Sequence, residues 1–289
     1  MMNLKKLISI VAMLSLAACG GGEPDETTAA QATRQHAESA PGSQATAAWT
    51  PQVGDTWQWQ LTGTINTSYD VKVYDIDLFD VPDSVFNTLH NQGRAVVCYF
   101  SAGSAEDWRA DYGQFKPADL GNKLGGWAGE RWVDTRSANV RAIMKARLDK
   151  AKARGCDGVE PDNVDGYQPA KKTGFPLTYA TQLDYNRFLA AEARARGLKV
   201  ALKNDVDQLA DLAPSFDFAV NEQCHQYKEC GGYSAFTGAG KPVFNAEYKK
   251  TWRDDANARA QMCADARAAN LRTLVLPVKL NDAFRYSCD

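Results

Sequence analysis

The chain has 289 residues, with 33 Lys and Arg against 35 Asp and Glu, so its formal net charge is −2 at pH 7. This near-neutral charge disfavours nucleic-acid binding, which usually needs a basic surplus. Three histidines are too few for a histidine-rich metal site and make a Ser-His-Asp triad a poor expectation. With 44% hydrophobic and 24% charged residues, the composition is typical of a globular protein with a sizeable core.

The first 18 residues have the pattern of a bacterial lipoprotein signal peptide. Lys5 and Lys6 precede an apolar stretch that is too short to span a membrane as a folded helix, and this stretch ends in Leu-Ala-Ala before Cys19. We therefore predict that residues 1–18 are removed and that Cys19 carries a lipid anchor. The alternative is an ordinary signal peptide followed by an incidental cysteine. Removal of two lysines with this segment leaves 31 cations against 35 anions, a net charge of −4.

From this predicted lipid anchor we expect a location in the bacterial cell envelope, with the outer membrane or the periplasmic face favoured over the inner membrane because no Asp follows Cys19. Residues 19–48 are rich in Gly, Ala, Thr, Gln, Glu and Ser and lack apolar periodicity, which predicts a flexible tether. We expect one folded domain over residues 49–289, because no second break in composition occurs there.

Short apolar runs alternate with helical patterns throughout this domain. The predicted strands are 57–61, 71–79, 94–101, 158–163, 199–204, 218–223, 241–248 and 273–278, and the clearest predicted helices are 137–154, 178–196 and 253–270. Gly155 and Gly197 stand where glycines commonly end helices. Eight strands with intervening helices predict an α/β fold, a single-domain (β/α)8 TIM barrel. A doubly wound open sheet is the alternative, but no GxGxxG loop follows an early strand.

Cysteine counting supports an oxidising compartment, because six cysteines remain once Cys19 is set aside. Among the fifteen possible pairings we prefer Cys98–Cys156, Cys224–Cys230 and Cys263–Cys288. The third pair is the least constrained, since either cysteine could be a reduced core residue. A zinc site at Cys224, His225 and Cys230 is a poor alternative, because this spacing matches no common ligand pattern.

Polar residues cluster at the carboxyl ends of the predicted strands, which in a barrel meet on the face that carries active sites. In chain order they are Asp75, Asp77, Asp80, Tyr99, Ser101, Gly103, Glu160, Asp162, Asn163, Asp165, Lys203, Asn204, Asp205, Asn221, Glu222, Gln223, Asn245, Glu247 and Tyr248. So many carboxylates repel one another and resist desolvation, so their convergence indicates function rather than structure.

Alternation along the strands separates the carboxylates by depth. Glu160 and Asp162 share a face, with Glu160 deeper in the barrel and Asp162 nearer the rim. Glu222 has an equivalent rim position two strands away. Two carboxylates at a barrel mouth, with little histidine available, suit glycoside hydrolysis. A Ca²⁺ or Mg²⁺ site is less favoured, because the carboxylates come from separate strands and not from one compact loop.

Aromatic residues in the predicted loops fit a carbohydrate ligand, since sugar rings present apolar CH faces to flat side chains. The candidates for this role are Trp108, Tyr112, Trp127, Trp132 and Trp252. Trp57 and Trp59 also fit a strand that packs into the core.

Several of these segments together resemble glycoside hydrolase family 114, the endo-α-1,4-polygalactosaminidases and their relatives. The segments are VCYFSAG (97–103), GGWAGERWVDTRS (125–137), GCDGVEPDNVDGY (155–167), FAVNEQC (218–224) and VFNAEY (243–248). The resemblance extends in consistent order from Trp49 to Asp289, although a lipid anchor is not general in the family. It implies a (β/α)8 barrel, with Asp162 as nucleophile and Glu222 as acid/base, and neither a metal nor an organic cofactor.

The resemblance implies endo-acting hydrolysis of an α-1,4-linked, galactosamine-containing polysaccharide. We expect Asp75, Asp77, Glu160 and Glu247 to attract the cationic sugar, and Lys203 to hold a carboxylate in its ionised state. We further expect a monomer that binds polysaccharide, and the membrane through Cys19, but no nucleic acid. The competing hypothesis is a barrel lipoprotein that binds polysaccharide without cutting it. The predicted substrate-binding residues are Asp75, Asp77, Tyr99, Ser101, Trp127, Glu130, Glu160, Asn163, Asp165, Lys203, Asn204, Asn221, Glu247 and Tyr248.

Overall fold

The computed structural model describes residues 49–289, so the predicted signal peptide, the anchor at Cys19 and the tether lie outside the described residues. The strands are β1 (Trp57–Gln60), β2 (Val73–Asp77), β3 (Ala95–Ser101), β4 (Ser104–Glu106), β5 (Leu120–Lys123), β6 (Glu130–Val133), β7 (Gly158–Asp162), β8 (Lys199–Lys203), β9 (Phe218–Glu222), β10 (Val243–Glu247), β11 (Leu271–Val275) and β12 (Tyr286–Ser287). The helices are α1 (Asp83–Asn91), α2 (Ala138–Ala153), α3 (Tyr179–Ala195), α4 (Leu209–Leu212), α5 (Cys224–Tyr227), α6 (Ser234–Thr237), α7 (Lys250–Asp254) and α8 (Ala256–Ala268).

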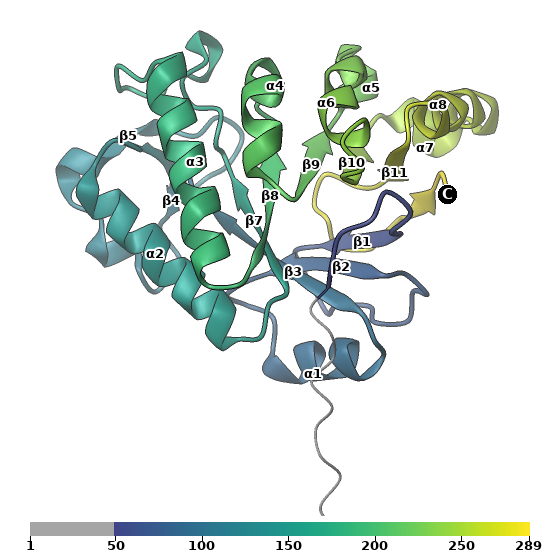
Figure 1. Cartoon of the computed structure of the whole chain (residues 1–289), viewed down its shortest axis with the longest axis horizontal. Helices are drawn as coiled ribbons and strands as arrows, with labels where there is room; N and C mark the ends of the chain where they lie inside the picture. The colour runs from purple at the N-terminus through teal and green to yellow at the C-terminus, as the bar shows by residue number, and fades with distance from the viewer. Residues whose placement is uncertain (1–48) are drawn as a thin grey trace, which may run out of the picture. The chain divides into compact units, whose positions relative to one another are not determined.

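Eight parallel strands form the barrel wall, in the order β1-β2-β3-β7-β8-β9-β10-β11, and β12 adds to β11 in antiparallel orientation. Figure 1 shows this curled sheet with helices along its outer side. Side-chain hydrogen bonds connect β1 with β11 and with the segment that follows β11. Trp57 Nε1 in β1 donates to the Arg272 carbonyl in β11 at 2.8 Å, and Arg285 donates to the Trp57 carbonyl at 2.9 Å. The predicted α/β (β/α)8 fold is confirmed.

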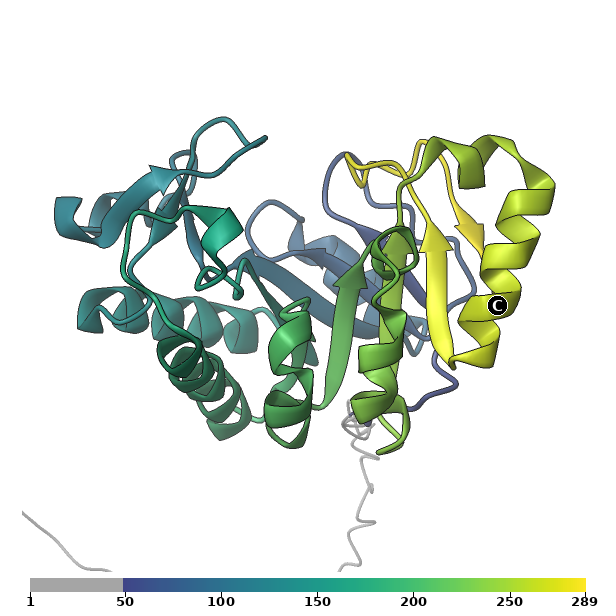
Figure 2. The same cartoon turned by 90° about the horizontal axis from the view of Figure 1, so that it is seen from above.

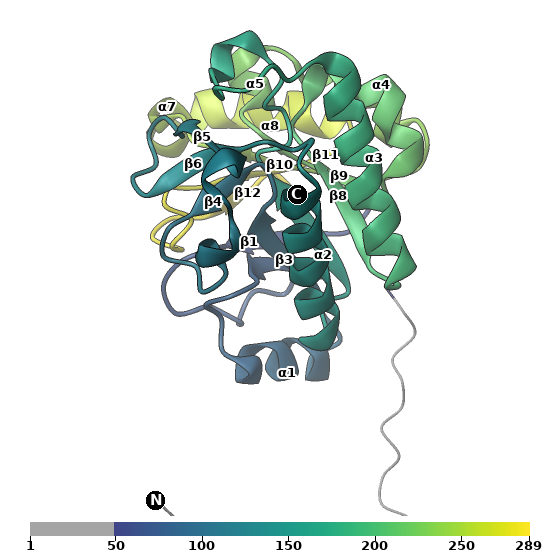
Figure 3. The same cartoon turned by 90° about the vertical axis from the view of Figure 1, so that its left-hand side faces the viewer.

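The longest helices begin and end where the sequence predicts. The Ser137 side chain accepts hydrogen bonds from two backbone N–H groups in the first turn of α2, and the Thr178 side chain caps α3 by accepting the Thr181 backbone N–H. Gly155 and Gly197 follow these two helices with φ of +81° and +71°, a conformation that favours glycine. Figure 3 shows α2 and α3 side by side on the barrel.

Three features depart from a regular (β/α)8 repeat. The described chain has no helix between β1 and β2, and the short strand β12 follows β11 in place of a last helix. An antiparallel sheet, in the order β4-β6-β5, is inserted between β3 and α2. The loop predicted at 125–137 therefore contains a strand, because residues 130–133 pair with both β4 and β5. The sequence pattern also missed α1.

The barrel interior is apolar at its base and polar at its carboxyl-terminal end. Trp57, Phe218 and Phe244 pack against one another at the base, with Phe244 5.1 Å from Trp57 and 5.7 Å from Phe218 between ring centroids. A larger cluster fills the space between the strands and the helices. In Figure 2 the arrowheads of the green strands point to the side where the small antiparallel sheet lies.

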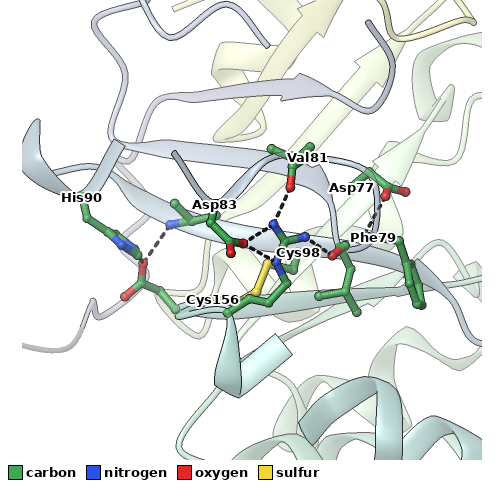
Figure 4. Close-up of a disulfide and its surroundings, with 11 residues drawn as sticks. Asp77, Phe79, Val81, Asp83, His90, Cys98 and Cys156 are labelled. Carbon is green, nitrogen blue, oxygen red and sulfur yellow. Dashed lines mark hydrogen bonds and ion pairs between the residues drawn. A yellow bond between two sulfur atoms is a disulfide. The ribbon is translucent and has the colours of Figure 1, made fainter. Parts of the chain in front are cut away.

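All three preferred disulfide pairings are present: Cys98–Cys156, Cys224–Cys230 and Cys263–Cys288. Figure 4 shows the first of them, which joins β3 to the residue two positions before β7. Beside it, His90 contacts the Asp157 carboxylate at 3.0 Å, which also accepts the Val96 backbone N–H. Within residues 49–289, none of the helices combines the length and the apolar character that a membrane span needs.

Candidate active site

A cleft of about 540 Å³ opens at the carboxyl-terminal ends of the barrel strands. Its wall combines predicted residues with others from the inserted sheet and from the segment after β11. The lining residues that the sequence singled out are Trp59, Asp77, Asp80, Tyr99, Trp108, Trp127, Glu130, Asp162, Asn163, Asp165, Lys203, Asn204, Glu222, Gln223 and Tyr248, and the additional ones include Leu61, Thr62, Glu106, Arg109, Leu124, Lys171 and Leu280.

Lys203, the last residue of β8, joins the carboxylates at the centre of the cleft. Its Nζ lies 2.7 Å from Glu160 Oε1, 3.1 Å from Asp162 Oδ1 and 3.4 Å from Glu222 Oε2. Burial opposes the charge on Lys203, but the three carboxylates outweigh it and raise the pKa of this amine well above its usual value. Lys203 is therefore a fixed cation, and it contacts both rim carboxylates.

Glu160 lies below the rim, as its position in β7 predicts. It is fully buried, and burial raises the pKa of its carboxyl group to about 7 against the effect of Lys203. Asp75 lies next to it, and burial together with the Glu160 carboxylate raises the pKa of Asp75 well above its usual range. One oxygen of each residue is buried without a hydrogen-bond partner. Two adjacent carboxyl groups in this setting favour a protonated Asp75.

Asp162 is held by neighbours from two strands. Its Oδ2 accepts hydrogen bonds from the Tyr99 hydroxyl at 3.0 Å and from Asn163 Nδ2 at 3.3 Å. Asn163 also donates to Ser101 Oγ at 2.9 Å, and Ser104 continues this chain to Glu130 at 2.7 Å. Burial raises the pKa of Glu130 to about 7. The Asp162 side chain remains 18% exposed, so it can meet a ligand while its orientation is fixed.

Glu222 ends β9 and has its own set of partners. The Tyr248 hydroxyl donates to Glu222 Oε1 at 2.5 Å, and the Glu222 backbone N–H donates to Asn204 Oδ1 at 2.9 Å. Burial and the Glu222 carboxylate raise the pKa of Tyr248 well above its usual range, so this tyrosine remains a proton donor. The Glu222 side chain is 29% exposed in the cleft.

The residue that follows each of β7, β8 and β9 has a left-handed backbone conformation. The φ angles are +60° for Asn163, +46° for Asn204 and +69° for Gln223, values that residues with side chains adopt rarely. Such conformations persist where the surrounding structure imposes them, and they concentrate at functional sites. Here they turn the chain at the strand ends, directly after Asp162, Lys203 and Glu222.

Arg109, which no sequence pattern singled out, organises a second group of carboxylates. It contacts Asp77 at 2.6 Å, Glu106 at 2.9 Å and Asp80 at 3.0 Å. Asp77 is thus neutralised by a buried arginine, and Asp75, Glu160 and Glu247 are buried as well. The expectation that these four residues attract the substrate from solution is therefore corrected: the exposed edges of Asp80, Asp162 and Glu222 are better placed to do so.

Asn221, Glu247 and Ser101 support the cleft without lining it. In β9 and β10, Asn221 and Glu247 alternate with the interior residues and point outward, where they accept the backbone N–H groups of Cys224 at 3.0 Å and His225 at 2.7 Å. Burial raises the pKa of Glu247 to about 7. The alternation that separated Glu160 and Asp162 by depth would also have placed these two residues outside the barrel.

Only part of the predicted aromatic platform lies in the cleft. Trp108 and Trp127 line it and are 51% and 53% exposed. Trp132 is buried at 3% exposure, Tyr112 packs near Phe115, and Trp252 packs against the Cys263–Cys288 region. The Trp59 side chain is buried in the core, which is one of the two positions that the sequence allowed. The Lys203 ammonium group lies over its ring, 4.6 Å from the ring centroid.

The one grouping of metal-binding side chains found in residues 49–289 is Cys224, His225 and Cys230. Both sulfurs are used in the Cys224–Cys230 disulfide, so neither is a thiolate ligand.

Comparisons with known proteins agree with this geometry. A crystal structure of Aspergillus fumigatus Ega3 in complex with galactosamine is 43% identical, covers 86% of this chain and all of that chain, and superposes with a TM-score of 0.78. The glycoside hydrolase domain of PelA from Pseudomonas aeruginosa shares the fold, at 17% identity and a TM-score of 0.62 over 81% of this chain and 99% of that one. An uncharacterized protein of Deinococcus radiodurans is 27% identical in an alignment of 299 positions, which covers 92% of this chain and 94% of that protein. The family model of glycoside-hydrolase family GH114 matches residues 38–289, and the chain belongs to this family of enzymes.

Proposed function

We propose that this glycoside hydrolase cleaves a galactosamine-containing polysaccharide at internal α-1,4 linkages, with Asp162 as nucleophile and Glu222 as acid/base. The observation that carries the proposal is the shared contact of both carboxylates with Lys203. Since Nζ lies 3.1 Å from Asp162 Oδ1 and 3.4 Å from Glu222 Oε2, these oxygens are at most about 6.5 Å apart, the sum of the two distances. Retaining glycosidases hold their carboxyl groups about 5–5.5 Å apart, and inverting ones about 6.5–9.5 Å.

This upper limit reaches only the lower end of the inverting range, so it favours a retaining reaction, which we propose. In the first step an Asp162 oxygen attacks the anomeric carbon while Glu222 donates its proton to the leaving glycosidic oxygen. In the second step Glu222 takes a proton from water, which attacks the same carbon and releases Asp162. Lys203 contacts Asp162 before attack, and Tyr99 and Asn163 fix the direction of its oxygens.

The charges and shape of the cleft suit a cationic sugar polymer. Galactosamine is the ligand bound to Ega3, and an unacetylated amino sugar is positively charged near neutral pH. Seven carboxylates line the cleft against four cationic side chains, so its potential favours such a ligand. A second hollow of about 590 Å³ shares Leu124, Trp127, Asn163 and Lys171 with the cleft, so the concave surface continues beyond the cleft itself.

The test is the formation of new reducing ends on an α-1,4-linked galactosamine polymer, with native protein compared to D162N and E222Q. Each substitution is expected to lower kcat by at least about a thousandfold while the thermal midpoint stays close to that of the native protein. Internal cleavage produces a rapid fall in polymer length at early times. Retention appears as α-configured product in the first minutes of NMR observation. Full activity in either variant would reject the assignment, and binding without new ends would support a non-catalytic binding barrel.

We also propose that residues 1–18 direct export and that Cys19 anchors the enzyme by a lipid, with residues 19–48 as the tether. The positive residues, short apolar stretch and Leu-Ala-Ala-Cys sequence support this proposal. Expression of the full chain and of Cys19→Ser in a bacterium, with labelled fatty acid, tests it. Label and membrane association in the full chain but not in the variant are expected, and equal labelling of the two would refute the proposal.

A further inference from the structure

The hollow next to the catalytic cleft carries charge of the opposite sign. It is lined by Asn122, Lys123, Leu124, Gly125, Trp127, Trp132, Asn163, Ala170, Lys171 and Lys172, a set with three lysines and no carboxylate. The catalytic cleft, in contrast, has an excess of carboxylates over cations. We call this second region the lysine hollow. A bound polymer that extends from the cleft into the lysine hollow therefore meets a change in electrostatic potential within a few sugar units.

The lysine hollow is a preformed part of the structure. Asn122 joins its two sides: its backbone N–H donates to the Thr173 carbonyl, and its Nδ2 donates to the Lys172 carbonyl, both at 2.8 Å. Arg131 holds the Gly121 carbonyl through two further hydrogen bonds at 2.9 and 2.6 Å. Trp132 is almost completely buried beneath this surface.

An aromatic ring connects the two regions. Trp127 lines both the cleft and the lysine hollow, and more than half of its surface is exposed. It lies on a tight turn, since Gly126 and Gly129 have φ of +86° and +90°. An exposed indole at this boundary can stack on a sugar ring irrespective of the charge of that sugar.

The lysines of the hollow, by contrast, disfavour a positively charged sugar. Lys171 is neutralised in part by Asp165 at 2.7 Å, whereas Lys123 and Lys172 are exposed and make no ion pair within residues 49–289. Two uncompensated ammonium groups repel a protonated amino sugar, but they do not repel a sugar whose amine is acylated. Asn122 Oδ1 accepts no hydrogen bond within the described chain, so it can accept the N–H of an acetamido group.

We propose that the lysine hollow is a subsite for an uncharged, N-acetylated sugar unit, and that the enzyme cuts mixed polymers a short distance from such units. The proposal rests on the proposed function and deepens it. Amine-bearing sugars occupy the catalytic cleft, and an N-acetylated unit occupies the lysine hollow on one side of the cleaved bond. The enzyme thus distinguishes N-acetylated from amine-bearing units because the electrostatic potential differs in sign between the catalytic cleft and the lysine hollow.

The experiment digests a partially N-acetylated α-1,4-galactosamine polymer and a fully deacetylated one, and sequences the products by tandem mass spectrometry. In the native protein, N-acetylated units should be enriched at one fixed position near one type of new end, reducing or non-reducing, and not near the other. The double variant K123E/K172E should lose this enrichment. Its kcat/KM on the fully deacetylated polymer should rise by about threefold to tenfold at low salt, and the gain should shrink as salt rises.

The matched control is K152E/K250E, which makes the same change in net charge at exposed lysines outside both regions. It should keep the native product pattern on the mixed polymer. A random acetylation pattern in native products, or an unchanged pattern in K123E/K172E, would overturn this inference while leaving the proposed hydrolysis intact. Failure of the native protein to cleave either polymer would instead refute the proposed function.

Discussion

The Tyr248 hydroxyl donates a 2.5 Å hydrogen bond to Oε1 of Glu222, across two adjacent strands of the barrel. This hydrogen bond fixes the position of Oε1, whereas Oε2 of the same carboxylate faces Lys203. Tyr248 is thus a positioning residue for the proposed acid/base. Its location one residue after β10 places it beside the end of β9, where Glu222 lies.

Removal of this hydroxyl in Tyr248→Phe should lower kcat by about tenfold to a hundredfold, because a hydrogen bond to a charged group contributes about 1.5–3 kcal/mol. KM should change by less than about threefold, because the hydroxyl acts through Glu222. Steady-state kinetics on the galactosamine polymer measure both constants. Tyr286→Phe, at a tyrosine away from the cleft, is the control. A change in KM alone would show that Tyr248 contacts substrate instead.

Lys203→Met leaves three carboxylates around a neutral side chain. Loss of one member of a buried ion pair typically costs about 3–5 kcal/mol, so we expect a large fall in the free energy of unfolding as well as in kcat. The double variant K203M/E160Q removes the deepest of the unpaired charges and should recover part of the stability, but not the activity. Chemical unfolding and initial rates for the single and double variants test this. Turnover of K203M at the native rate would remove Lys203 from the scheme.

Gly103 packs so closely against the strand end at Asp162 that a side chain cannot be added. A Cβ there would lie 1.7 Å from the Asn163 carbonyl oxygen, so Gly103→Ala must displace the residue next to the proposed nucleophile. We expect kcat to fall at least tenfold, because small shifts of catalytic groups are costly to rate. Gly113→Ala is the matched control, since a Cβ at that position meets nothing within 4 Å. Equal kinetics in the two variants would contradict the prediction.

The buried carboxyl of Glu247 makes stability depend on pH. Its pKa is raised from 4.5 to about 7 in the folded protein, so the folded state holds this proton more tightly than the unfolded chain does. The resulting stabilisation is fully present below about pH 4.5 and is lost as pH rises through about 7. Glu247→Gln cannot ionise, so it does not lose stability through this group as pH rises. Between pH 4.5 and 8 its free energy of unfolding should therefore increase relative to that of the native protein, by at most about 3 kcal/mol.

Urea unfolding at several pH values measures this difference between native protein and Glu247→Gln. Asp184→Asn, at an exposed ion pair with Arg141, is the control and should show little dependence on pH. A gain for Glu247→Gln that grows toward acid pH would have the wrong sign and would contradict the assigned shift.

The disulfides should differ in what they support. Cys98–Cys156 closes a loop of 58 residues and Cys224–Cys230 one of 6, so loop entropy predicts stabilisations of about 4 and about 2 kcal/mol. Paired substitution by serine should therefore lower the thermal midpoint more at the first bridge. Activity at low temperature should fall more at the second, because Cys224 lies two residues after Glu222. The reverse order in either measurement would show that the bridges act differently.

The sequence by itself predicted the eight barrel strands, the longest helices, the barrel and the relative depth of Glu160 and Asp162, and it favoured the three disulfide pairings that the structure contains. Each of these depends on local periodicity, on capping residues or on spacing along the chain, and such signals are contained in a few neighbouring residues. The same alternation, applied to Asn221 and Glu247, would have placed them outside the barrel. The inserted sheet β4–β6 was missed because its strands are short and lie between glycine-rich turns.

Only the tertiary structure decided which charges compensate one another. Lys203 meets Glu160 across 43 residues of sequence, and Arg109 meets Asp77 across 32. Nothing in the local pattern distinguishes a carboxylate that lies beside a buried cation from one that faces solvent. That distinction depends on the register of neighbouring parallel strands and on the curvature of the sheet, which bring distant side chains within hydrogen-bond distance at the carboxyl-terminal end of the barrel.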